Sequence, residues 1–308
     1  MNRYLFLVIL GLMASITLFT LALGGSHVVL FNPAGYIAKR EVALMVLALR
    51  LMLIVVIPVF VLTFAIAWHY RAGNASARYL PNWEHNRLEE AIWWLVPCVI
   101  IVALASITWT SSHALDSYRD IATSTPPVEI EVVSLAWKWL FIYPQQGIAT
   151  VNTLTIPVGT PISFKLTSDA PMNALWIPQL SGQEMMMPGM VTELHLEADA
   201  PGNYHGLSAN YSGDGFAGMQ FTAHAVSKSD FDAWVAGVRA ATSTLDRQTY
   251  AALAVPSQNV PPRTYARADP SLYTWIVMKY MAPDATSSSM RSASNGSAIG
   301  AMSGMTAR

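Results

Sequence analysis

The sequence predicts a membrane-anchored chain of mixed class, in which two transmembrane helices precede an all-β Greek-key sandwich with C-terminal helices. Of the 308 residues, 53% are hydrophobic and only 12% are charged, and the mean hydropathy is +0.36. This composition is too apolar for an ordinary soluble protein and too polar for a chain that lies wholly in a membrane. The long apolar runs end near residue 110, and short β-like runs follow. The net charge of −1 and the lack of a basic stripe exclude nucleic acid as a partner.

The first apolar run, at residues 4–23, follows Arg3 and ends at the small residues Ala22 and Gly24. Its length favours a retained membrane anchor, whereas the Ala22-x-Gly24 pattern favours cleavage as a signal peptide. We therefore assign residues 1–25 to a signal peptide or an N-terminal anchor, and both alternatives stay open.

The next two apolar runs, at residues 51–69 and 91–110, predict a transmembrane helical hairpin within residues 42–112. Each run is long enough to cross about 30 Å of hydrocarbon as a helix. Membrane helices tolerate internal prolines such as Pro58 and Pro97. Tryptophans lie near the ends of the runs, as in an aromatic belt: Trp68, Trp93, Trp94 and Trp109.

Charges flanking the hairpin predict its orientation. The connector at residues 70–90 contains three arginines, Arg71, Arg78 and Arg87. By the positive-inside rule this connector is cytoplasmic, although Lys39 and Arg40 weaken the contrast. Everything after about His113 then lies in the periplasm of a bacterium, and the chain is a multi-pass protein of the inner membrane.

Two isolated side chains in the apolar runs have simple interpretations. Arg50 is predicted at the outer edge of its helix, where it would extend to the interface rather than act in transport. Cys98 is the single cysteine, so the chain can form no internal disulfide and no metal site with two thiolates.

From Pro126 onward, short strands separated by Pro and Gly turns predict a Greek-key sandwich at residues 126–227. The predicted strands cover residues 128–134, 137–143, 150–156, 162–167, 191–196 and 219–226.

Residues 228–282 are predicted to form a helical extension. Ser229 is the expected cap of its first helix, and Asp269 followed by Pro270 opens a helix that continues to Met281. Residues 283–308 are mostly Ser, Ala, Gly and Met, which predicts a disordered tail.

The loop at residues 204–219 has the outline of a copper-binding loop without its ligands. In subunit II of cytochrome c oxidases this loop reads Gly-x-Cys-x-x-x-Cys-Gly-x-x-x-His-x-x-Met, and a His from an earlier segment and a carbonyl between the two Cys complete a dinuclear copper centre. Gly206, Gly213 and Met219 keep this frame here. The ligand positions hold other residues: Ser208 and Ser212 for the thiolates, Phe216 for the loop His, Asn173 for the earlier His, and Asn210 between the serines.

Copper at such a centre needs thiolate and imidazole donors, which hydroxyls and a phenyl ring cannot replace. No metal site is therefore expected in this chain. The loop resembles that of the quinol oxidase branch of the haem-copper oxidases, the cytochrome bo type, whose subunit II has lost the centre. The resemblance covers about residues 27–282 and implies that the β domain is cupredoxin-like.

The aromatic motif Trp137, Lys138 and Trp139 also matches this family. In the copper-bearing relatives an aromatic strand here lies on the path of electrons from cytochrome c. Without copper, we expect these rings to pack the sandwich and to dock it on the large subunit.

Glu89 and Glu90 begin the run at residues 91–110, and carboxylates are favoured in the first turn of a helix by its dipole. The resemblance implies more for Glu90, because it aligns with a carboxylate at the cytoplasmic mouth of a proton channel. We therefore expect Glu90 to lie at the entrance of that channel.

The resemblance implies subunit II of a proton-pumping ubiquinol oxidase, a respiratory oxidoreductase that passes electrons from ubiquinol to dioxygen. This chain would hold no catalytic centre and no cofactor, because the haems and copper belong to the large subunit I. Its expected partners are subunit I, further small membrane subunits, membrane lipid and, through the complex, ubiquinol. Two alternatives are a cytochrome c oxidase subunit II that carries electrons through dinuclear copper, and a free-standing, membrane-tethered cupredoxin-like binding module.

Overall fold

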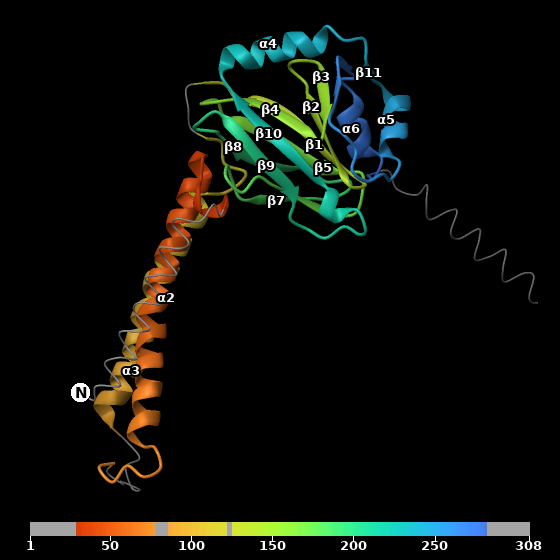
Figure 1. Cartoon of the computed structure of the whole chain (residues 1–308). Coiled ribbons are helices and arrows are strands. Elements are labelled where there is room, and N and C mark those ends of the chain that lie inside the picture. The colour runs from red at the N-terminus through yellow and green to blue at the C-terminus, as the bar shows by residue number, and fades with distance from the viewer. Residues whose placement is uncertain (1–28, 78–85, 122–124, 282–308) are drawn as a thin grey trace, which may run out of the picture.

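A helical hairpin carries a β-sandwich at one end (Figure 1). The computed structural model describes residues 29–77, 86–121 and 125–281. The predicted N-terminal run, Arg78 and the predicted tail at residues 283–308 lie outside the described residues.

The first long helix, α2, spans Tyr36–His69, after the short 3-10 helix η1 at Val29–Phe31. Its 34 residues extend for about 51 Å. It begins fifteen residues before the predicted run because residues 36–50 contain neither Gly nor Pro and are rich in Ala, Leu and Val. The prediction that Arg50 lies at the edge of its helix is therefore wrong, since Arg50 lies well inside α2 and is exposed.

The second long helix, α3, spans Arg87–Ala114 and is capped by Asn86, whose side chain accepts from the backbone N–H of Leu88 at 3.1 Å. Both α2 and α3 are long and apolar enough to cross a membrane, and their most apolar segments are not buried by other parts of the described chain. Leu, Ile and Val side chains on both helices are exposed. The hairpin therefore needs lipid or another protein around it.

The sandwich consists of a six-stranded sheet in the order β12-β3-β2-β1-β5-β8 and a five-stranded sheet in the order β4-β10-β9-β6-β7. β1 pairs in parallel with β5, and β4 in parallel with β10, whereas the other pairs in these sheets are antiparallel. The strand bounds are β1 Val128–Leu135, β2 Lys138–Tyr143, β3 Ile148–Val151, β4 Thr153–Pro157, β5 Ile162–Ser168, β6 Asn173–Trp176, β7 Gln183–Met186, β8 Thr192–Leu196, β9 Gly202–Ser208, β10 Gln220–Val226 and β12 Arg263–Tyr265.

The predicted strand at residues 150–156 is in fact two strands that belong to different sheets, β3 and β4. Asn152 separates them with a left-handed φ of 55°, a conformation that Asn adopts more readily than most residues. Its side chain accepts from the N–H of Trp139 at 2.8 Å and donates to the carbonyl of Val260 at 2.7 Å. These contacts hold the point at which the chain crosses between the sheets.

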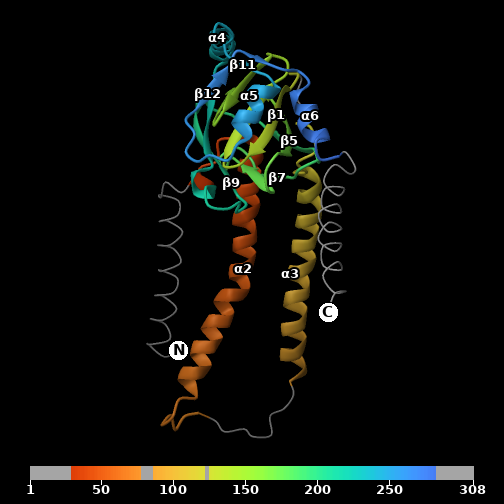
Figure 2. The same cartoon turned by 90° about the vertical axis from the view of Figure 1, so that its right-hand side faces the viewer.

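The six-stranded sheet is buried on both faces. From β1, Ile130 and Val132 face the core between the two sheets, whereas Val133 and Leu135 face a second core. That second core is covered by the helices α5 at Arg247–Ala254 and α6 at Leu272–Met278, which lie over the outer face of this sheet (Figure 2). In antiparallel sheets one face is commonly exposed to solvent, and polar and apolar residues then alternate along each strand. The consecutive apolar residues of β1 reflect the second layer that covers this sheet.

The C-terminal region contains α4 at Lys228–Arg239, α5 at Arg247–Ala254 and α6 at Leu272–Met278, with the short strands β11 at Thr244–Leu245 and β13 at Arg267–Ala268. The predicted cap at Ser229 is wrong by two residues, because Ser227 accepts from the N–H of Asp230 at 3.1 Å. Asp269 accepts from the N–H of Ser271 at 2.8 Å, yet α6 begins only at Leu272.

Candidate functional site

Two of the positions that correspond to copper ligands meet where β6 and β9 lie side by side. Asn173 begins β6 and Ser208 ends β9, and both are almost fully buried. The hydroxyl of Ser208 lies 3.0 Å from Oδ1 of Asn173 and 3.1 Å from the carbonyl oxygen of Asn210. The Asn210 side chain donates to the carbonyl of Met172 at 2.8 Å. These three predicted positions therefore form one hydrogen-bonded group.

This group continues across the core to β1 and β5. Asn173 donates through Nδ2 to the carbonyl of Pro171 at 2.9 Å and lies 3.4 Å from Oγ of Ser134. Ser134 donates to Oγ of Ser168 at 2.7 Å. We call the four buried side chains of Ser134, Ser168, Asn173 and Ser208 the hydroxyl–amide cluster. Each has a polar partner, as buried polar groups require.

The loop between β9 and β10 is held by Trp137. Its indole N–H donates to the carbonyl of Ser212 at 3.1 Å, and its ring lies 2.4 Å from where a Cβ on Gly215 would stand. Gly215 is therefore required for this close packing. Phe216 begins the 3-10 helix η2 at Phe216–Gly218, and its ring contacts that of Tyr211 with centroids 5.5 Å apart. Phe216 thus packs on the loop itself.

Two further positions of the copper-like loop, Met219 and Ser212, lie apart from the hydroxyl–amide cluster. Met219 is buried in the core between the sheets, and its carbonyl accepts from the indole of Trp139 at 3.3 Å. Ser212 has a buried hydroxyl with no hydrogen-bond partner among the described residues. Within the described residues, the carbonyl of Met219 accepts from the backbone N–H of Ser208 at 3.4 Å, but neither side chain forms a hydrogen bond with the hydroxyl–amide cluster.

A dinuclear copper centre does not fit the residues present here. The positions that would hold it carry neutral hydroxyl, amide and phenyl groups, and thiolate and imidazole are the donors that copper prefers. Within residues 29–77, 86–121 and 125–281, no three or more His, Cys, Asp or Glu side chains group so that they could hold a metal ion. Cys98 is on α3, in the hairpin rather than in the sandwich.

The motif of Trp137, Lys138 and Trp139 divides between the two faces of its sheet. Trp139 is fully buried between the sheets, with its ring 5.6 Å from that of Phe221. Lys138 is buried near the C-terminal region, where its Nζ donates to the carbonyl of Val255 at 2.7 Å and to Oγ of Ser257 at 2.6 Å. Burial, with the nearby charge of Arg263, lowers the pKa of Lys138. The lysine therefore fastens the segment after α5 to β2.

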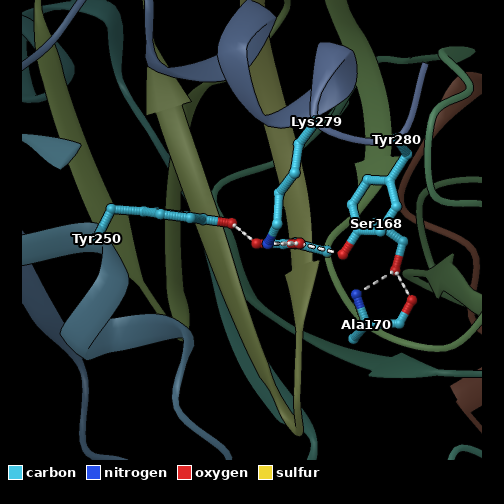
Figure 3. A network of polar contacts seen from close by, with 6 residues as sticks. Ser168, Ala170, Tyr250, Lys279 and Tyr280 are labelled. Carbon is cyan, nitrogen blue, oxygen red and sulfur yellow. Dashed lines mark hydrogen bonds and ion pairs between the residues drawn. The ribbon is translucent and has the colours of Figure 1, made fainter. Parts of the chain in front are cut away.

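A second polar network, which sequence analysis did not predict, adjoins the hydroxyl–amide cluster (Figure 3). Asp169 follows Ser168 directly, and its side chain is 1% exposed. It accepts from the hydroxyl of Tyr250 at 2.5 Å, from Nζ of Lys279 at 2.7 Å and from the hydroxyl of Tyr280. We call these four side chains the C-terminal clamp.

The two tyrosines of the clamp act as hydrogen-bond donors to Asp169. Burial, together with the hydrogen bond to Asp169, raises the pKa values of Tyr250 and Tyr280, so both phenols stay protonated and donate. The lysine adds a full positive charge. The only feature of the sequence that could have indicated this network is an acidic residue directly after an apolar strand. The partners of Asp169 could not be predicted, because they lie 81 to 111 residues away in the chain.

Glu90 lies in the first turn of α3, which begins at the end of the hairpin remote from the sandwich (Figure 2). Its backbone N–H donates to the carbonyl of Asn86 at 2.9 Å. The side chain of Glu90 is half-buried, whereas that of Glu89 is exposed. The two neighbouring carboxylates therefore differ in environment, as two residues 100° apart around a helix do.

The chain is similar to known proteins over most of its length. A family model described as the COX Aromatic Rich Motif matches residues 239–284, which include α5, α6 and the clamp residues Tyr250, Lys279 and Tyr280. The chain is 52% identical to the cytochrome bo(3) ubiquinol oxidase subunit 2 of Pseudomonas aeruginosa, over 84% of this chain and 78% of the relative.

A second relative and a solved domain are also similar to the chain. The chain is 47% identical to the ubiquinol oxidase subunit 2 of Acetobacter aceti, over 84% of this chain and 85% of the relative. The periplasmic domain of subunit II of the cytochrome oxidase of Bradyrhizobium japonicum is similar with a TM-score of 0.36 and 20% identity, over 38% of this chain and 96% of that domain.

Proposed function

The chain belongs to the family of ubiquinol oxidase subunits 2, and we propose that it is the subunit without a redox centre in a proton-pumping enzyme that transfers electrons from ubiquinol to dioxygen. The observation that carries this proposal is the 52% sequence identity to the Pseudomonas aeruginosa subunit over 84% of this chain. The neutral donors at Asn173, Ser208 and Ser212 support it over the alternative of an electron-carrying, copper-binding subunit.

In this proposal the haems, the copper and the quinol site belong to a large subunit I. The exposed apolar side chains along α2 and α3 support a large membrane partner, because such surfaces are buried by lipid or protein. Further small membrane subunits complete the complex. This chain supplies its hairpin as an anchor and its sandwich as a cap.

We further propose that the cap lies in the periplasm of a bacterium and the hairpin turn in the cytoplasm, with the helices in the inner membrane. Arg71 and Arg87 flank the turn, and positive charge near helix ends favours the cytoplasmic side. Arg71 stacks on the ring of Trp68 at 4.5 Å, which is a suitable arrangement for the interface at this end of α2.

Glu90 is proposed as the residue at which protons from the cytoplasm reach the channel that leads into subunit I. Its place in the first turn of α3 supports this role, since the positive end of the helix dipole stabilises the ionised carboxylate. A group at a channel mouth must exchange protons with bulk water and also adjoin the protein interior. The half-buried side chain of Glu90 suits such a place better than the exposed side chain of Glu89.

The test is Glu90→Gln in the assembled oxidase, with Glu89→Gln as the matched control. Glutamine keeps the size of the side chain but cannot carry the proton. We expect oxygen consumption with saturating quinol to fall about tenfold in Glu90→Gln and less than about twofold in Glu89→Gln. The loss in Glu90→Gln is smaller than the roughly 100-fold or more typical of a lost acid–base group, because water can still reach the channel mouth. Haem spectra and subunit content should be unchanged. Equal, mild effects of both changes would mean that Glu90 only stabilises the start of α3.

A further inference from the structure

A polar cavity lies where the hairpin joins the sandwich, outside the sites described above. It has a volume of about 520 Å³, and charged or aromatic groups line it. These come from the start of α2, from the segment after α3 and from the end of β8: Tyr36, Arg40, Asp116, Arg119, Asp120 and Glu197. We call it the joint cavity.

The two arginines of the joint cavity have N–H donors that are not used in hydrogen bonds within the described residues. Arg40 stacks over the ring of Tyr36 at 4.4 Å, and Arg119 donates to the carbonyl of His113 at 3.3 Å. Within the described residues neither guanidinium forms an ion pair with a carboxylate. Since each guanidinium has five N–H donors, most of this capacity is available to a ligand. Arginine recognises phosphate groups in a two-pronged geometry.

The same cavity also offers negative charge. Asp116 and Glu197 line it, and Asp120 is held 3.0 Å from Nε2 of His195. Burial, with the nearby charge of Asp199, raises the pKa of Glu197, so a cation beside it would stabilise its ionised form. The cavity is thus suited to a ligand that carries both a phosphate and a cation.

An apolar groove continues from the joint cavity between α2 and α3. A first part of about 390 Å³ shares Arg40 and Ala114 with the cavity, and a second part of about 290 Å³ follows. Both parts are lined by Leu44, Leu47 and Leu115. A hydrocarbon chain would lie in such a groove without exposing its length to water.

The depth of the cavity matches that of lipid head groups. The apolar run of α3 ends near Trp109, five residues before Ala114, which corresponds to about 8 Å along the helix axis. The interfacial region of a bilayer has about this thickness beyond the hydrocarbon.

We propose that the joint cavity and the groove bind one phosphatidylethanolamine molecule. Its phosphate would contact Arg40 and Arg119, its ammonium would contact Asp116 and Glu197, and an acyl chain would fill the groove. Phosphatidylglycerol has no cation to offer the carboxylates, and phosphatidylcholine has a cation without N–H donors. The pairing of both charges therefore selects the ethanolamine head group. This inference does not depend on the role of Glu90.

The experiment uses the whole purified oxidase with photoactivatable phosphatidylethanolamine, and mass spectrometry locates the labelled peptides. We expect labelling on the segments that contain Leu44 to Leu51 and Leu104 to Leu115. In Arg40→Gln combined with Arg119→Gln, labelling at these segments should fall about tenfold, as expected for lost charge-assisted hydrogen bonds. Arg71→Gln is the matched control, because Arg71 also stacks on an aromatic ring but lies at the other end of α2.

A change of lipid preference gives the second measurement. Asp116→Asn removes negative charge from the cavity and should lower labelling by phosphatidylethanolamine while raising labelling by photoactivatable phosphatidylglycerol. The proposal is overturned if the double arginine variant is labelled as strongly as the native complex. It is equally overturned if the native complex takes both lipids alike, or if Asp116→Asn leaves their ratio unchanged. If the double arginine variant fails to assemble, the lipid preference of Asp116→Asn alone tests the proposal.

Discussion

Neutral groups stabilise one another in the hydroxyl–amide cluster, so this part of the sandwich needs no ion to hold it together. Burying a hydroxyl or an amide without a partner is costly, and here four strands supply partners for each other. The adjoining loop is fixed by the indole of Trp137, which lies against Gly215. This part of the sandwich is thus maintained by hydrogen bonds and aromatic packing.

The first residue-scale prediction concerns copper. The full chain, purified in detergent, incubated with copper and then desalted, should retain no stoichiometric copper, because its hydroxyl and amide donors are poor ligands for that metal. Elemental analysis by mass spectrometry measures the ratio of copper to protein. A tightly held, stoichiometric copper with a near-infrared absorption band would contradict the assignment of Ser208 and Ser212 as non-ligands.

The second residue-scale prediction concerns Glu131 of β1. Burial raises its pKa to about 7 from the model-peptide value of 4.5, against an opposing effect of Lys165, and Glu129 adds to the increase. The folded chain therefore binds this proton more tightly than the unfolded chain, and stability falls as pH rises from about 4.5 to about 7. Glu131→Gln should remove this loss and stabilise the chain at pH 8 by about 1–2 kcal/mol, a figure reduced for partial solvent exposure.

Urea unfolding of the full chain in detergent, followed by tryptophan fluorescence at pH 5 and pH 8, measures this effect. Glu129→Gln is the control, because Glu129 lies on the same strand and contributes least to the raised pKa of Glu131, so this change should reduce the pH effect only slightly. The difference in unfolding free energy between pH 5 and pH 8 should be smaller in Glu131→Gln than in the native chain. If it is the same in both, Glu131 is not the source of the pH dependence.

At the scale of elements, the sequence predicts those features that depend on local pattern. The two apolar helices and the strands β1, β2, β5, β8 and β10 follow from composition and alternation. The break at Asn152 could not be predicted, because an unbroken strand through residues 150–156 has equally good alternation and only tertiary partners select the crossing. Helix α5 was missed because it is short, at eight residues, and takes its stability from the second core.

The C-terminal clamp gives the element-scale prediction. Asp169→Asn removes the charge that accepts from Tyr250, Lys279 and Tyr280, and leaves Lys279 beside a neutral group. We expect a loss of about 2 kcal/mol in unfolding free energy, because the buried Asp169 loses its charge-assisted hydrogen bonds, although solvent around the 45% exposed side chain of Lys279 weakens the ion pair itself. Hydrogen exchange in α6 should rise more than in β1, since α6 lies next to the clamp.

Asp232→Asn is the matched control for the clamp, because Asp232 forms an exposed ion pair with Lys228 at 2.6 Å on α4. That change should cost less than about 0.5 kcal/mol. Equal losses in the two variants, or unchanged exchange in α6, would mean that the apolar contacts of α6 hold it without the clamp.

At the scale of the whole molecule, the hairpin and the sandwich are joined by close backbone contacts. The N–H groups of Ala34 and Gly35 donate to the carbonyl of Gln179 at 2.7 and 3.0 Å, and a Cβ on Gly35 would lie only 2.4 Å from the carbonyl oxygen of Leu180. These contacts join residues about 145 positions apart in the chain. Sequence patterns identified the copper-loop positions and Glu90 separately, but they carry no information on such distant partners or on the joint cavity.

The orientation of this joined molecule in the membrane gives the last prediction. In a Cys98→Ser background, Thr242→Cys places a thiol on an exposed loop of the cap, and Ser76→Cys places one on the exposed turn of the hairpin. A membrane-impermeant maleimide should label Thr242→Cys in spheroplasts and leave Ser76→Cys unlabelled, because positive charge near Ser76 keeps the turn in the cytoplasm. Inside-out vesicles should give the opposite result. If only Ser76→Cys is labelled in spheroplasts, the orientation is the opposite of the proposed one. Glu90 would then lie on the periplasmic side, where it could not take up protons from the cytoplasm.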